Sequence, residues 1–68
     1  MRITVNGKAR DIDCEMDLPA FLRTFNVEPK LVAVAINGDV IARDQYEAAR
    51  VREGDDIEVV RMVGGGTQ

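Results

Sequence analysis

The chain has 68 residues, a formal net charge of −3 and no histidine, and 46% of its residues are hydrophobic while 31% are charged. This length fits one small domain, and the composition is typical of a folded globular protein. The missing histidine excludes His-based catalytic triads and His-liganded metal sites, and an acidic chain without a Lys/Arg cluster is not expected to bind nucleic acid.

Two strands and one helix are predicted in the first half of the chain. Residues 1–5 alternate between apolar and polar side chains, Asn6-Gly7 is a strong hairpin-turn signal, and residues 9–13 are predicted as the return strand. A helix is predicted after Asp17, which can cap it, with Pro19 in the first turn. Its apolar side chains recur at i, i+3, i+4 and i+7 and therefore share one face: Leu18, Phe21, Leu22 and Phe25.

Three further strands are predicted in the second half. Residues 31–36 form an apolar run typical of a central strand, and Asn37-Gly38 predicts a second hairpin turn leading into Val40 and Ile41. Residues 43–50 are polar and irregular, with a helical turn expected around Tyr46. After a turn at residues 53–56, residues 57–63 form the last predicted strand.

One amphipathic helix beside four or five short strands predicts an α+β domain, in which the helix packs across one face of a mixed sheet. The predicted domain comprises residues 1–63, and residues 64–68 are predicted to be a flexible tail. Phe21 is assigned to the core by its helical spacing. The other predicted core residues are Ile3, Val5, Ile12, Leu18, Leu22, Phe25, Val32, Val34, Ile36, Ile57 and Val59.

The last five residues, Gly64-Gly65-Gly66-Thr67-Gln68, follow the final predicted strand directly. Glycine lacks a Cβ, so a glycine tail can thread a narrow channel with backbone angles closed to other residues. A small domain with such a tail is suited to present a terminal carboxyl group to another enzyme. Because no P-loop or dinucleotide motif is present either, the chain is predicted to be a substrate, carrier or binding module rather than an enzyme.

The final strand also predicts a docking patch. If Ile57 and Val59 face the helix, Val60 and Met62 face the other side of the sheet beside the tail. Exposed there, they are predicted to dock a partner. The alternatives are that a twist or bulge turns one of them inward, or that both are isolated exposed apolar residues. Arg61 either steers that partner or only solvates the strand.

The single cysteine, Cys14, excludes an internal disulfide and fits a reducing compartment. No signal peptide opens the chain, and no apolar run approaches the length of a membrane span. The chain is therefore expected in the cytoplasm, as a monomer without a membrane partner.

The order of two strands, a helix, two strands and a closing strand with a glycine tail resembles the β-grasp, or ubiquitin-like, fold. Within that fold the chain resembles the ThiS-like sulfur carriers of the ThiS/MoaD family. The resemblance is carried by residues 32–43 (VAVAINGDVIAR), by residues 53–60 (EGDDIEVV), which continue into the glycine tail, and by the Asn6-Gly7 hairpin.

This resemblance implies a mechanism and a set of partners. An E1-like (ThiF-like) adenylating enzyme uses ATP and Mg²⁺ to adenylate the carboxylate of Gly66, and Gly64 and Gly65 give the tail its reach. A cysteine desulfurase supplies the sulfur that converts the acyl adenylate into a thiocarboxylate. A thiazole synthase (ThiG-like) then takes the sulfur into the thiazole of thiamin. The carrier itself is expected to bind no cofactor and no metal.

Thr67-Gln68 departs from the family pattern, in which the diglycine usually ends the chain. With these residues present the carbonyl of Gly66 is an amide and cannot be adenylated. Three explanations are open: trimming by a JAMM-type metalloprotease, a remnant of cloning, or loss of the carrier role. Processing is favoured. The alternative functions are a related carrier for cysteine, methionine or molybdopterin synthesis, a ubiquitin-like protein modifier, and a non-catalytic β-grasp interaction module.

Overall fold

The computed structural model describes residues 1–62. Its main sheet contains two β-hairpins, each with a predicted Asn-Gly turn. β1 (Arg2–Val5) and β2 (Lys8–Asp11) pair antiparallel, as do β4 (Val32–Ile36) and β5 (Asp39–Val40). All four turn residues have positive φ: 50° and 82° at Asn6 and Gly7, and 52° and 88° at Asn37 and Gly38. Asparagine and glycine tolerate this region best, so both predicted hairpins are confirmed.

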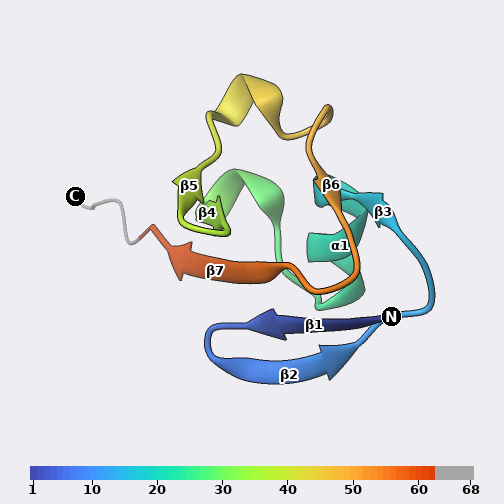
Figure 1. Cartoon of the computed structure of the whole chain (residues 1–68). Helices are drawn as coiled ribbons and strands as arrows, with labels where there is room; N and C mark the ends of the chain where they lie inside the picture. The colour runs from blue at the N-terminus through green and yellow to red at the C-terminus, as the bar shows by residue number, and fades with distance from the viewer. Residues whose placement is uncertain (63–68) are drawn as a thin grey trace.

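β7 (Asp56–Arg61) lies in the middle of a five-stranded sheet with the order β2-β1-β7-β4-β5. It runs parallel to β1 and antiparallel to β4, so the sheet is mixed, as predicted. In Figure 1 the first and the last strand of the chain lie beside each other, and α1 lies behind the segment that joins β6 to β7. The strand that leads to the tail is therefore held on both sides.

The helix α1 (Leu18–Thr24) begins where the sequence predicts. The side chain of Asp17 caps it, because Asp17 Oδ1 accepts a hydrogen bond of 2.8 Å from the backbone N–H of Ala20. Pro19 lies in the first turn, where no intrahelical N–H is needed. With seven residues, α1 is the one α-helix of the described residues, and no helix in residues 1–62 is long and apolar enough to cross a membrane.

A second, two-stranded sheet was not predicted. It joins β3 (Met16–Asp17) to β6 (Arg50–Val51), and two short 3₁₀ helices, η1 (Pro29–Leu31) and η2 (Arg43–Gln45), complete the described structure. A strand of two residues is too short to show a period in the sequence. The predicted second strand was also too long, since β2 ends at Asp11, although the N–H of Ile12 still bonds the carbonyl of Met1 at 2.9 Å.

The core lies between α1 and the sheet and differs from the predicted core at its periphery. Four residues predicted as core, Val5, Phe25, Ile36 and Val59, are only half-buried and pack against its edge. Two residues that were not predicted, Tyr46 and Val51, are buried because η2 and β6 close one end of the core. The buried hydrophobic residues are Ile3, Ile12, Leu18, Phe21, Leu22, Val32, Val34, Tyr46, Val51 and Ile57.

The last strand ends at Arg61 rather than at Val63. Met62 still continues the pairing, because its N–H donates to the carbonyl of Leu31 at 2.8 Å. Val63 and the predicted tail, Gly64 to Gln68, lie outside the described residues. The predicted boundary between domain and tail lies there as well.

Candidate docking face

The register between β4 and β7 decides which side chains face α1. Val34 lies opposite Val59, and Ile36 lies opposite Ile57. Directly opposed residues project to the same face of a sheet, and Ile57 and Val34 are fully buried while Val59 is half-buried against the core. The prediction that Ile57 and Val59 face the helix is therefore confirmed.

The alternate residues of the same strands form the opposite face. Ala33 lies opposite Val60, while Ala35 lies opposite Glu58 on one side and Val40 on the other. Because successive side chains of a strand alternate between faces, these five residues point away from α1. Val60 and Val40 are exposed here, as a docking surface requires.

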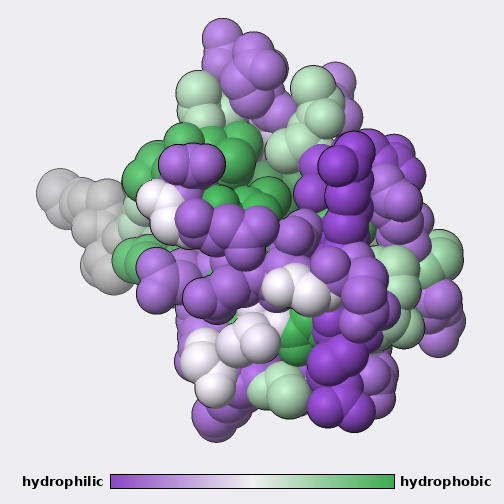
Figure 2. Space-filling model, in the orientation of Figure 1, coloured by the Kyte–Doolittle hydropathy of each residue, from purple (hydrophilic) through white to green (hydrophobic). Residues whose placement is uncertain are grey.

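The exposed large hydrophobic side chains of residues 1–62 gather on this face. Val40 is 80% exposed, Val60 62%, Leu31 53% and Met62 46%. Met62 follows Val60 at the period of a strand, and its hydrogen bond to Leu31 places those two side by side. Figure 2 shows the hydrophobic surface over the β4–β5 hairpin and at the end of β7. We call this surface the outer face and define it as Leu31, Ala33, Ala35, Val40, Glu58, Val60 and Met62.

The outer face contains a shallow depression of about 180 Å³. Its floor is formed by the small side chains of Ala33 and Ala35, and Val40, Val60 and Glu58 stand around it. Small residues between larger ones produce a concave surface, the shape that receives a projecting side chain of another protein.

Arg61 does not lie on the outer face. It is opposite Val32, a buried residue that faces α1, so Arg61 belongs to the side of the sheet away from Val60 and Met62. The docking role predicted for Val60, Met62 and Arg61 remains a prediction, with Arg61 placed on the other side of β7 from its two partners. Leu31 and Val40 were not recognised in the sequence, although the run of residues 31–36 is apolar at every position and therefore on both faces.

Charged side chains are paired elsewhere on the molecule. Arg2 bonds Asp11 at 2.9 Å, and the hydrogen bond and charge of this guanidinium lower the pKa of the Asp11 carboxyl. Arg50 and Arg52 both bond Glu15 at 3.2 Å and lower its pKa through their hydrogen bonds. In contrast, Glu58 on the outer face forms no ion pair with any described residue.

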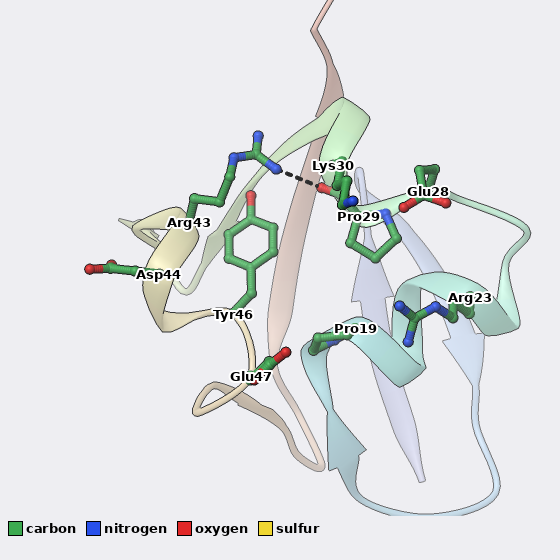
Figure 3. Close-up of a pocket in the computed structure, with 9 residues that line it drawn as sticks. All are labelled: Pro19, Arg23, Glu28, Pro29, Lys30, Arg43, Asp44, Tyr46 and Glu47. Atoms are coloured by element: carbon green, nitrogen blue, oxygen red, sulfur yellow. Dashed lines mark hydrogen bonds between the residues drawn. The ribbon is translucent and has the colours of Figure 1, made fainter.

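A cavity of about 410 Å³ lies between α1, η1 and η2 (Figure 3). Arg43 reaches across it and donates to the carbonyl of Pro29 at 3.0 Å, with its guanidinium 5.4 Å from the ring centre of Tyr46. The hydroxyl of Tyr46 donates to the carbonyl of Val32 at 3.0 Å. These hydrogen bonds hold η2 and the residue that follows it against η1 and β4. Within residues 1–62, no three His, Cys, Asp or Glu side chains gather as a metal site would require.

The sequence and the fold were compared with those of known proteins. A model of the ThiS family matches residues 3–66. The chain belongs to the ThiS family. The ThiS thiamine biosynthesis protein of Geobacter metallireducens, a crystal structure, is similar with a TM-score of 0.85 and 33% identity, covering 97% of this chain and 100% of that one. The β-grasp fold predicted from the sequence is thereby confirmed.

Two curated relatives extend the comparison. The sulfur carrier protein ThiS of Bacillus subtilis (strain 168) is 31% identical over 67 residues, covering 94% of this chain and 98% of the relative. A thiazole synthase of Paramagnetospirillum magneticum is 31% identical over 67 residues, covering 98% of this chain but 21% of the relative. This chain thus spans about a fifth of that longer protein. The family match confirms the resemblance to the ThiS family that the sequence predicts.

Proposed function

We propose that this ThiS-family chain carries sulfur for thiamine biosynthesis as a thiocarboxylate on Gly66. The observation that carries the proposal is the extent of the family match, which runs from residue 3 and ends on Gly66. Thr67 and Gln68 lie beyond it. The family pattern therefore stops at the glycine whose carboxyl group the chemistry needs.

The chemistry requires the carboxylate to be activated, because a carboxylate is a poor electrophile. The activating partner uses ATP and Mg²⁺ to form an acyl adenylate on Gly66 and releases pyrophosphate. A persulfide sulfur then attacks the acyl carbon, AMP leaves, and reductive cleavage of the S–S bond by a thiol leaves the thiocarboxylate. The adenylate must be shielded from water, and residues 63–66 span at most ~14 Å when extended, enough to reach a pocket while the domain docks outside.

Release of the Gly66 carboxyl group must precede activation, because Thr67 follows Gly66 in the sequence. We propose that a protease, of the JAMM type, hydrolyses the Gly66–Thr67 peptide bond. The products are a carrier that ends at Gly66 and a fragment that begins with Thr67. Only the first of these can be adenylated.

The outer face is the surface through which the carrier docks on its E1-like adenylating enzyme. Its exposed apolar side chains continue along β7 to Met62, so a partner bound there lies next to the start of the tail. An exposed cluster of this kind is typical of a protein-binding surface. The same face serves the acceptor enzyme in turn, because both partners must reach the same carboxyl group.

A thiazole synthase is the proposed sulfur acceptor. Support comes from the Paramagnetospirillum relative, a thiazole synthase of which a fifth of the length resembles this chain. A carrier segment within an acceptor enzyme keeps sulfur donor and acceptor at a high effective concentration. The sulfur source is a cysteine desulfurase.

The intact mass of the carrier tests the proposal. The full chain and a form ending at Gly66 are each incubated with the adenylating enzyme, ATP, Mg²⁺, cysteine desulfurase and cysteine. The form ending at Gly66 should gain about 16 Da, as one oxygen is replaced by sulfur, and omission of ATP should abolish the gain. The full chain should not change without a protease. An unchanged mass together with no ATP–pyrophosphate exchange would contradict the proposal. A ladder of higher-mass conjugates would instead indicate a protein modifier.

A further inference from the structure

Glu58 is a carboxylate placed within an apolar surface. It lies opposite Ala35 in the β4–β7 ladder and stands at the depression that Ala33, Val40 and Val60 also line. It is exposed, and in the described part of the chain it has no cationic partner. A partner that covers the outer face therefore removes this charge from water.

Burying an unpaired carboxylate opposes binding strongly, whereas a cation that bonds it removes most of that penalty. An apolar partner surface would leave Glu58 desolvated and unpaired. The composition of the outer face thus selects for a partner with a positive charge at one defined place. This selection follows from charge complementarity and not from the apolar area alone.

The shape of the depression specifies the kind of cation. Lysine and arginine carry their charge on an apolar stem of three or four methylene groups, which prefers to lie on apolar surface. Here Ala33, Ala35 and the two valines offer apolar surface to such a stem, and Glu58 lines the same depression and can bond its charged end. A depression of about 180 Å³ is of the size of one long side chain rather than of a helix or a strand.

We propose that the outer face binds a protein that projects one arginine or lysine into this depression, and that Glu58 is the specificity-determining residue that pairs with it. The proposal rests on the proposed carrier function, in which the adenylating enzyme docks here. A second copy of this chain is a poor occupant, because self-association of the outer face would bury two Glu58 carboxylates without adding a cation.

Binding of the adenylating enzyme to the carrier ending at Gly66 tests the proposal by calorimetry at low and high salt. Glu58→Gln should weaken binding by about 30-fold or more and flatten its salt dependence. Glu28→Gln changes the net charge equally at an exposed site beside α1 and should leave the dissociation constant within about twofold. Ala35→Leu, which fills the depression, should also weaken binding.

A charge swap completes the test. Glu58→Lys should abolish binding, and replacing the partner's facing arginine or lysine by glutamate should restore it. Unchanged or tighter binding by Glu58→Gln would overturn the proposal, as would a dimer of the carrier in sedimentation that Glu58→Gln strengthens. These results differ from a failure of the carrier function itself: if only the inference fails, wild type and Glu58→Gln gain sulfur at the same rate, whereas if the function fails neither does.

Discussion

The side chain of Asn6 forms two hydrogen bonds with the backbone of Val59. The N–H of Val59 donates to Asn6 Oδ1 at 2.8 Å, and Asn6 Nδ2 donates to the carbonyl of Val59 at 3.2 Å. The parallel ladder between β1 and β7 ends at the pair Val5 and Ile57, so the amide of Asn6 extends it by one step. A residue of the first hairpin turn thus holds the last strand of the sheet.

Replacing Asn6 by glycine should destabilise the domain by about 1–2 kcal/mol, since two hydrogen bonds are lost. Glycine accepts the φ of 50° at this position, so the loss reports the side-chain amide rather than backbone strain. Asn26→Gly is the matched control, because Asn26 has a similar φ of 59° and no side-chain hydrogen bond within the described residues. Urea unfolding measures both variants, and equal free energies of unfolding would contradict the prediction.

The hairpins show how far the sequence alone reaches. Asn-Gly predicts a tight turn because both residues accept positive φ, and both turns form. The Asn-Gly motif does not predict that Asn37 Oδ1 accepts a hydrogen bond of 2.9 Å from the N–H of Asp56, or that the side chain of Asn6 bonds the backbone of Val59. These contacts join residues 19 and 53 positions apart, and only the assembled sheet brings them together.

Tyr46 is another residue whose role depends on tertiary structure. It lies in a polar, irregular stretch and was predicted only as part of a helical turn, yet the residue is only 6% exposed. Removing its hydroxyl in Tyr46→Phe leaves the carbonyl of Val32 with its longer bond of 3.3 Å from Arg43. We expect a loss of about 0.5–1.5 kcal/mol in the free energy of unfolding with the fold unchanged. Thermal unfolding measures the loss of stability, and an amide NMR spectrum shows whether the fold is unchanged. A melting temperature equal to that of the wild type would contradict a stabilising role for the hydrogen bond between Tyr46 and Val32.

Glu15 and Asp11 should titrate at lower pH than ordinary carboxyl groups. Hydrogen bonds from Arg50 and Arg52 lower the pKa of Glu15, and a hydrogen bond from Arg2 lowers that of Asp11. A carboxyl whose folded pKa is depressed contributes stability above its unfolded pKa, and that contribution is lost as pH falls through the folded value. Carbon-detected NMR titration measures both pKa values. Because the groups are exposed, 1 M NaCl should raise them, and values at or above the ordinary range in low salt would contradict the ion pairs.

Part of the outer face was also predictable from the sequence. Val60 and Met62 follow from the alternation of the last strand once Ile57 is assigned to the core. Val40 and Leu31 belong to other segments, and their place beside Val60 depends on the register of β4 with its two neighbours. Arg61 is next to Val60 in the sequence, yet the same alternation turns it to the opposite face.

Val60→Asp should prevent docking without unfolding the chain. Val60 is 62% exposed, so an aspartate there remains solvated in the free chain. In a complex it would be buried beside Glu58 and would add a carboxylate for which the partner has no cation. We expect binding to the adenylating enzyme to weaken by about 100-fold or more, while the free energy of unfolding changes by about 1 kcal/mol at most.

The matched control is Asn26→Asp, which adds the same charge. Asn26 is exposed just beyond α1 and has positive φ, which aspartate tolerates. This variant should bind within about twofold of wild type, so that the difference between the two variants isolates position from charge. Binding by calorimetry and thiocarboxylate formation by intact mass should fall together in Val60→Asp. If Val60→Asp bound and reacted like Asn26→Asp, the partner would not use the outer face, and the docking surface would have to be sought on the helix side of the sheet.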